Sequence, residues 1–422
     1  MLKAGISKVK ITPPFGLEMA GYGIYLNRIG KEIHDDLFAR AVLFDDGLNR
    51  ALLIVCDLCG VGRHFVMQCR KEISSALEMS EDNITISTTH THSGPTTVYL
   101  RGWGDMDKNY MVFLKEKIIE AAKEANKNLE PVIIGAGQGK VEINFNRVVK
   151  GGPTDTALMV LRVDNLSGKT KAILYNYSAH AVVMGPDSFA VSADWPGYAS
   201  AKLDSVLSGG MGMFLQGFCG DVNIKDNGSS SFDKAKEYGE ILANEVLRVT
   251  KKIKLEKSKK IKMYSKIINL PLHIPDQKDI EDMLQHYAEH RKQANWERFF
   301  QEWKDDTIRE INRNPRDVLP AEIQILAIDN DILFVMEPGE VFTKWGMKIK
   351  EISPFKNTFV IGYANDCIGY IPDKDDFVRK GYAAHMVPLI LGFFHFKPNA
   401  GEILVEGVGE LTEDIKCLLN KK

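Results

Sequence analysis

Apolar runs rich in β-branched residues alternate with amphipathic segments along nearly the whole chain, and this alternation constrains the fold most. ALLIVCDL (51–58), ALMVLRVD (157–164) and EIQILAIDNDILFVMEPGE (322–340) are typical of buried strands. Residues 110–128 and 234–249 carry apolar side chains at helical spacing. Strands and helices mixed in this way predict a mixed α/β fold, in which a layered β-sheet domain is flanked by helices.

The segment 275–315 differs from the rest of the chain because it is highly charged and has a proline near each side. Its apolar residues recur at helical spacing, so the pattern predicts a helical excursion from the main body. A lid, an oligomer contact and a solvated hairpin all fit this pattern, and a packing or solvated role is favoured. The sequence leaves a homo-oligomer open.

The charge balance excludes some classes of partner. The 422 residues include 54 basic and 56 acidic side chains, a net charge of -2, so we expect no nucleic-acid binding. No window approaches the roughly 20 apolar residues of a transmembrane helix. The N-terminus lacks the apolar core of a signal peptide, so a cytoplasmic location is expected. For Cys56 and Cys59, buried reduced thiols are favoured over a zinc or redox role.

The glycine-rich stretch GAGQGK (135–140) invites comparison with phosphate-binding loops. It lacks the Ser or Thr of a P-loop, and strand-like sequence flanks it on both sides. A hairpin turn between two strands is therefore favoured over phosphate binding.

His90 and His92 close the strand-like run NITISTT (83–89). Residues two apart on a strand point the same way, so both imidazoles can reach one site. A second strand ends at His180 in YNYSAH, and a third at Glu340 in VMEPGE. Imidazole and carboxylate are usual ligands of Zn²⁺, so these strand ends predict a zinc site with open positions. Hydrogen-bonded structural histidines are the alternative.

An ordered set of motifs then extends along the chain. The motifs are AGISKVKITPPFG, THTHSGP, INFNR, GPTDTALMVLRV, YSAH, SADWPGY, CGDVN, EPGE and GYIPDKDDF. In this order they resemble the catalytic domain of the neutral/alkaline, non-lysosomal ceramidases, and the resemblance covers nearly the whole chain. It implies one such domain over residues 1–422, without the C-terminal Ig-like domain of the larger members, and a zinc amidase activity on an N-acyl bond.

The resemblance also implies which residues form the site. Four residues match the family's zinc ligands: His90, His180, Glu340 and Tyr370. Tyr363 and Tyr382 are alternatives to Tyr370 as the tyrosine ligand. His92 and Arg147 match residues that face the substrate.

Asn223 stands where the family pattern has a catalytically important serine. An amide cannot act as a nucleophile, but it can orient a substrate or polarise a carbonyl. This departure, with the missing secretion signal and Ig-like domain, weighs against ceramide itself as the substrate.

The sequence therefore predicts a zinc-dependent hydrolase that cleaves an amide or ester of a small-molecule or lipid-like substrate with a zinc-activated water. In this hypothesis Arg147 stabilises the oxyanion and His92 carries the proton. Asp57 and Asp194 either orient ligand histidines or cap turns. Two alternatives stay open: a zinc hydrolase of a sugar or other soluble metabolite, with Trp103 and Trp195 as stacking residues, and a non-catalytic binding relative.

Overall fold

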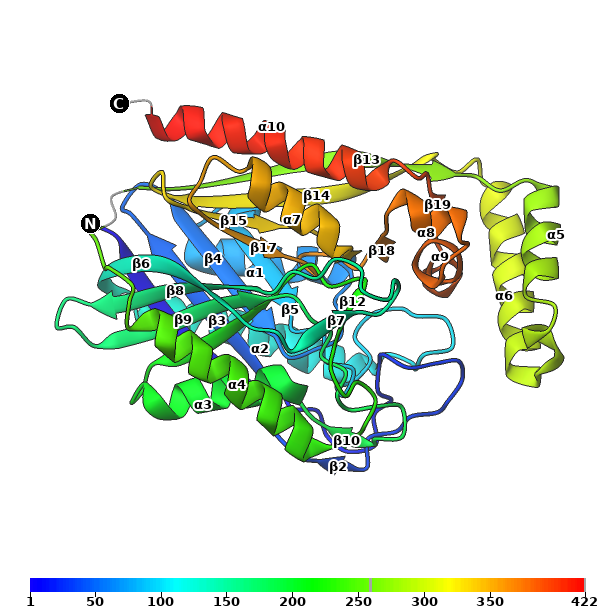
Figure 1. Ribbon diagram of the computed structural model, residues 1–422, viewed down its shortest axis with the longest axis horizontal. Coiled ribbons are helices and arrows are strands. Elements are labelled where there is room, and N and C mark those ends of the chain that lie inside the picture. Colours follow the sequence, from blue (N-terminus) through cyan, green and yellow to red (C-terminus); the bar gives the residue numbers. More distant parts are fainter. Residues whose placement is uncertain (258–259, 421–422) are drawn as a thin grey trace.

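Two β-sheets pack face to face between layers of helices in the computed structural model, which describes residues 1–257 and 260–420 (Figure 1). The larger sheet has the order β11-β9-β8-β6-β1-β3-β4-β5 and the smaller β17-β15-β14-β13-β19. The strands of the larger sheet are β1 (Lys3–Lys10), β3 (Phe38–Asp45), β4 (Arg50–Cys56), β5 (Ile84–Thr88), β6 (Glu130–Lys140), β8 (Ala157–Asn165), β9 (Thr170–Tyr177) and β11 (Met211–Gln216). Those of the smaller sheet are β13 (Ile261–His273), β14 (Val318–Ile328), β15 (Ile332–Met336), β17 (Asn357–Ile361) and β19 (His395–Phe396).

Helices cover the outer faces of both sheets. On the larger sheet lie α1 (Arg63–Leu77), α2 (Lys108–Lys127), α3 (Asp194–Val206) and α4 (Phe232–Thr250). On the smaller sheet lie α7 (Thr343–Ile352) and α10 (Ala400–Asn420). Side chains alternate across each strand, so Leu333 and Val335 face these helices while Phe334 and Met336 face the other sheet. Both faces of β15 are buried, which explains its unbroken apolar sequence and confirms the predicted layered α/β fold.

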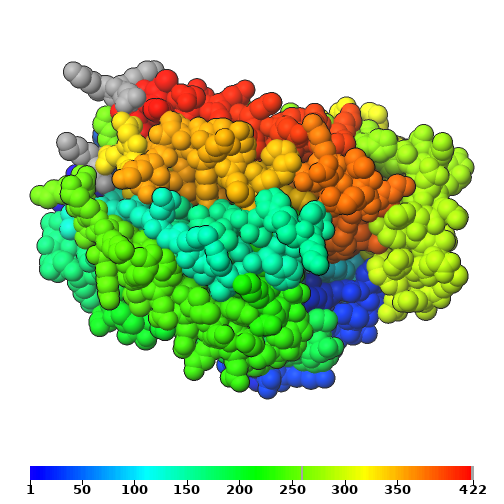
Figure 2. Space-filling view, viewed as in Figure 1, coloured from blue at the N-terminus to red at the C-terminus, as the bar shows by residue number. Residues whose placement is uncertain are grey.

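The predicted helical excursion is a hairpin of α5 (Gln277–His286) and α6 (Ala294–Ile311), joined through a short 3-10 turn at His290–Lys292. Figure 2 shows it as a lobe at one end of the molecule. Phe299, Phe300 and Trp303 of α6 are buried, and they pack on the segment that contains a π-helical turn (Tyr382–Met386) and α9 (Val387–Leu391). One side of the hairpin is therefore part of the core, and its charged side faces solvent.

Short strand pairs join the loops at the ends of the sheets. They are β2 (Glu32–Ile33) with β10 (Ala190–Val191), β7 (Asn144–Asn146) with β12 (Val222–Ile224), and β16 (Glu340–Val341) with β18 (Tyr370–Ile371). The remaining short helices are the 3-10 turn Glu81–Asn83 and α8 (Lys374–Val378). Within the described ranges, no helix combines the length and the apolar character that a bilayer span requires.

The glycine-rich stretch is not a turn, and that prediction was wrong. Its glycines lie inside the continuous strand β6, against the end of α4. A Cβ on Gly135 would lie 2.2 Å from the carbonyl oxygen of Lys254, and one on Gly137 would lie 3.0 Å from the Ile253 side chain. Glycine is needed here because another backbone approaches the strand closely.

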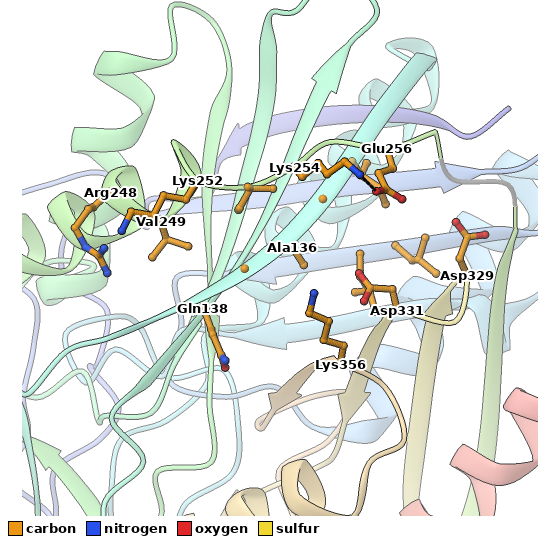
Figure 3. Close-up of a pocket in the computed structure, with 16 residues that line it drawn as sticks. Ala136, Gln138, Arg248, Val249, Lys252, Lys254, Glu256, Asp329, Asp331 and Lys356 are labelled. Atoms are coloured by element: carbon orange, nitrogen blue, oxygen red, sulfur yellow. Dashed lines mark ion pairs between the residues drawn. The ribbon is translucent and has the colours of Figure 1, made fainter.

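A surface cavity of about 670 Å³ lies beside this contact (Figure 3). Lys254 and Glu256 form an ion pair of 3.0 Å at its edge. Charges of both signs line the cavity: Arg248, Lys252, Lys254 and Lys356 against Glu256, Asp329 and Asp331. This mixture gives no concentrated positive field for a phosphate group.

Candidate active site

Segments that follow strands of both sheets meet around one pocket of about 330 Å³, here called the central pocket. Its polar lining contains His90, His92, Arg147, Asn223, Glu340, Tyr370 and Tyr382. His180 is fully buried directly behind it, with its ring centroid 4.9 Å from that of His90. The structure therefore brings together the seven residues predicted for the site: His90, His92, Arg147, His180, Asn223, Glu340 and Tyr370. Their roles stay predictions.

Backbone pairing fixes these residues beside one another. Thr91 pairs with Ala181, and His180 pairs with Asn223, so the segments after β5, β9 and β11 are joined edge to edge. Glu340 and Tyr370 are direct register partners in the parallel pair β16–β18.

One glycine allows the β16 and β18 strands to approach. Gly339 has φ 88, and a Cβ there would lie 2.4 Å from the carbonyl oxygen of Gly369. His90 itself adopts φ 61, in the left-handed region that is costly for a residue with a Cβ. Strain of this kind persists only where the surrounding structure holds it, and it concentrates at functional sites.

Three ligand-type atoms converge at the wall of the central pocket. Nε2 of His90, Nε2 of His180 and an oxygen of Glu340 lie within 4.8 Å of one another. The two imidazole nitrogens are 3.4 and 3.1 Å from Oε2 of Glu340. Two imidazoles and one carboxylate form a typical three-ligand set of catalytic zinc sites.

Backbone carbonyls orient both imidazoles. Nδ1 of His90 lies 2.7 Å from the carbonyl oxygen of Cys59, and Nδ1 of His180 lies 3.0 Å from that of Val222. A carbonyl only accepts, so each Nδ1 carries a proton and donates it, and in the neutral form of each ring the lone pair of Nε2 faces Glu340. Lone pairs that face one another in this way repel unless a cation lies among them, so these residues fit a metal ion.

The electrostatics favour positive charge at the same position. Burial alone would lower the pKa of His90, yet the Glu340 carboxylate beside it raises this pKa to about 10. Burial would raise the pKa of Glu340, but the two histidines hold it well below the ordinary value. Burial and the nearby Arg147 lower the pKa of His180 to about 4. The carboxylate therefore stays ionised and attracts positive charge.

Tyr370 is better placed as a fourth ligand than Tyr363. Its hydroxyl oxygen lies 3.5 Å from Nε2 of His180 and accepts a hydrogen bond of 2.6 Å from Nη2 of Arg147. The hydroxyl of Tyr363 is 3.4 Å from Oε2 of Glu340, but it also contacts the Cys219 sulfur at 3.2 Å. Tyr363 instead stacks on the ring of His90 at a centroid distance of 4.0 Å.

His92 lies at the edge of the ligand set. Its Nε2 is 3.0 Å from Nε2 of His90, and its buried Nδ1 has no hydrogen-bond partner within the described part of the chain. Burial and the charges of His90 and His180 hold the pKa of His92 well below the ordinary value. A neutral imidazole there can accept a proton.

Comparison with known proteins decides the relationship. Residues 2–231, more than half of the chain, match the family model described as "Neutral/alkaline non-lysosomal ceramidase, N-terminal". The chain belongs to this family. The matched range, residues 2–231, contains five of the predicted site residues: His90, His92, Arg147, His180 and Asn223. Glu340 and Tyr370 lie beyond it.

Curated neutral ceramidases align with about half of the chain. Neutral ceramidase A of Dictyostelium discoideum is 27% identical over 248 residues, which cover 51% of this chain and 34% of that protein. The neutral ceramidase of Drosophila melanogaster is 26% identical over 252 residues, 52% of this chain and 36% of its own length. The aligned part therefore spans only about a third of each relative.

Solved structures extend the fold similarity to nearly the whole chain. The neutral ceramidase from Pseudomonas aeruginosa superposes with a TM-score of 0.75 at 17% identity, covering 98% of this chain and 75% of that one. A ceramidase described as complexed with C2 gives 0.77 at 16% identity with the same coverage. The predicted family and the predicted fold class are confirmed.

Three predicted contributions to the neutral/alkaline ceramidase site are not seen. Asp57 accepts from the backbone N–H of Phe38, and Asp194 accepts from those of Met184 and Trp195, so neither orients a ligand histidine. Trp195 is fully buried and donates to the carbonyl oxygen of His180, so it cannot stack on a ligand. These residues follow the alternative explanation, in which they support turns and core.

Proposed function

We propose that the chain is a zinc-dependent hydrolase that cleaves an amide or ester bond of an N-acyl or related compound. The observation that carries the proposal is the convergence of His90, His180 and Glu340, with both imidazoles oriented by backbone carbonyls. The similarity to neutral ceramidases of Dictyostelium discoideum and Drosophila melanogaster supports a hydrolase. Zinc is the metal that this ligand set and its buried geometry favour.

His90, His180, Glu340 and Tyr370 would hold the ion. When bound, zinc supplies Lewis acidity and lowers the pKa of water toward neutrality. The protein supplies the rest, because the buried walls exclude bulk solvent and strengthen every electrostatic interaction inside.

In this proposal Arg147 and Asn223 bind the carbonyl of the substrate. Nη2 of Arg147 is fixed by the Gly220 carbonyl at 2.8 Å and by Tyr370. Nη1 of Arg147 donates to Oδ1 of Asn223 at 3.4 Å, which leaves Nδ2 of Asn223 to donate into the pocket. Donors fixed in advance around a developing oxyanion are a main source of rate enhancement.

His92 is the proton acceptor of the proposal. Its Nε2 lies 3.0 Å from Nε2 of His90, at the edge of the proposed ligand set, where it can take up a proton and later release it to the leaving group. Asn223 cannot exchange a proton as a serine hydroxyl does, so this proposal assigns the function to His92.

Metal analysis and a substrate panel test the proposal together. The protein as purified is expected to contain one zinc per chain by elemental analysis. It is expected to hydrolyse members of a panel of N-acyl and ester compounds but not glycosides, and to lose this activity to a chelator and regain it with zinc. Chelator-sensitive cleavage of glycosides would favour the sugar-directed alternative.

Variants make the ligand assignment specific. His90→Ala is expected to lose both zinc and activity, whereas His290→Ala, at an exposed histidine of the hairpin, is expected to keep both. Full zinc content in folded His90→Ala would contradict the site. Zinc content without any hydrolysis across the panel would favour a binding relative.

A further inference from the structure

The central pocket is separated from a second, apolar cavity by a thin partition. The second cavity, here called the side groove, has a volume of about 670 Å³ and is lined by Phe65, Tyr99, Met106 and Phe393 among others. Val98, Cys367 and Leu391 line both the central pocket and the side groove. These three side chains, the partition, therefore have one cavity on each side.

The partition is a packed layer. A Cβ on Gly60 would lie 3.5 Å from the Val98 side chain and 3.7 Å from the Cys367 side chain, so these two lie side by side over Gly60. A Cβ on Gly369 would lie 2.6 Å from Leu391, which therefore packs directly on the backbone next to Tyr370. Val98 and Leu391 are only 6% and 7% exposed.

The α5–α6 hairpin supports the partition through its contacts with α9. Leu391 ends α9, and its neighbours Leu389 and Ile390 are buried in the same cluster as Phe300 and Trp303 of α6. Arg101, which donates to the carbonyl oxygen of Leu389, is also paired with Asp306 of α6 at 2.7 Å. Outward movement of α9 would break these contacts, so the partition has little room to yield.

We propose that Val98, Cys367 and Leu391 set the length of apolar chain that the central pocket accepts. Resting on the proposed function, this assigns the hydrolase a compact substrate with a short apolar acyl group. The central pocket, about 330 Å³, has about half the volume of the side groove. While the partition stands, an acyl chain can use only the part of the central pocket beyond the amide group. Val98, Leu100, Val387 and Ile390 offer that chain an apolar wall.

Binding of straight-chain fatty acids from four to sixteen carbons, measured by calorimetry on the zinc-loaded protein, tests the partition without catalysis. Each added methylene that enters the pocket is expected to raise the affinity about four-fold. In the wild type this gain is expected to stop within the series, at the chain length that reaches the partition. Leu391→Ala is expected to join the two cavities. The affinity should then continue to rise for several carbons beyond the wild-type limit.

Met111→Ala is the matched control, because Met111 lines the side groove but not the central pocket. It removes as many atoms as Leu391→Ala and is expected to keep the wild-type limit. Val98→Ala is a second opening variant in case Leu391→Ala does not fold.

Three results would overturn the proposal: no binding of any fatty acid, a wild-type affinity that rises up to sixteen carbons, or a limit unchanged in both opening variants. A chain-length limit without hydrolysis of any N-acyl compound would instead support the partition and overturn the proposed function.

Discussion

Arg147 donates a 2.6 Å hydrogen bond to the hydroxyl oxygen of Tyr370, although the two residues are 223 positions apart in the chain. The same guanidinium reaches Asn223, so one rigid, planar group joins the tyrosine beside His180 to the amide of Asn223. This contact links the two halves of the site, and the first prediction follows from it.

Arg147→Lys is expected to lower kcat/KM by about 10²-fold while the protein keeps its zinc. A lysine keeps the charge but has no planar fork, so it cannot hold Tyr370, Asn223 and the Gly220 carbonyl at once. Steady-state kinetics with metal analysis checks this. A variant with wild-type kcat/KM would show that the fork has no role in the reaction.

The amide at Asn223 is expected to act as a hydrogen-bond donor. Asn223→Ala should reduce kcat by about 10²-fold, because a donor to the developing oxyanion is lost. Asn223→Ser keeps a donor at this position and should retain more activity than the alanine variant. Equal kcat values for the two variants would exclude the donor role.

Asp57 is expected to make stability fall as the pH rises. Burial raises its pKa from 3.8 to about 6, so between these values the folded protein binds more protons than the unfolded chain. The contribution of Asp57 to the free energy of unfolding therefore decreases across this window. It is about 3 kcal/mol lower above pH 6 than below pH 4. Asp57→Asn should remove this contribution and be the more stable protein at pH 7.

Urea denaturation of Asp57→Asn and wild type between pH 4 and 7.5 measures that difference. Asp187→Asn, at an exposed carboxylate, is the control and should follow the wild type at every pH. A difference between Asp57→Asn and wild type that does not change with pH would refute the assignment to Asp57.

Phe300→Ala tests whether the hairpin belongs to the core. Phe300 is 1% exposed, so its truncation is expected to cost about 3–5 kcal/mol of unfolding free energy and to lower the melting temperature. Phe15→Ala, at a 66% exposed side chain, should change the stability by no more than about 0.5 kcal/mol. Similar melting temperatures for the two variants would mean that the hairpin contributes little to the fold.

Local sequence was sufficient for the strands and for the residues at their ends. The apolar runs of β4, β8 and β15 are long enough to identify buried strands, because both of their faces are covered. His90, His180 and Glu340 each follow a strand, and sequence alone marks them as metal-ligand types at chain turns.

Local sequence was misleading where a distant contact decides the structure. The glycines of β6 resemble a turn, yet they are there because the end of α4 packs on the strand. Asp57 and Asp194 lie beside strand ends, where a carboxylate that orients a metal-binding histidine is often found. His90 and His180 are instead oriented by the backbone carbonyls of Cys59 and Val222. A carbonyl is present at every residue, so no sequence signal distinguishes these two.

The sequence by itself determined the family, the layered α/β class and the set of side chains available for a metal site, because periodicity and residue chemistry are local properties. Only the tertiary structure decided that the Tyr370 hydroxyl lies 3.5 Å from Nε2 of His180, that the hairpin supports α9, and that Leu391 lines two cavities. These facts depend on strand register and on packing between segments far apart in the chain. Such contacts are set by the global fold and leave no periodic trace in either segment.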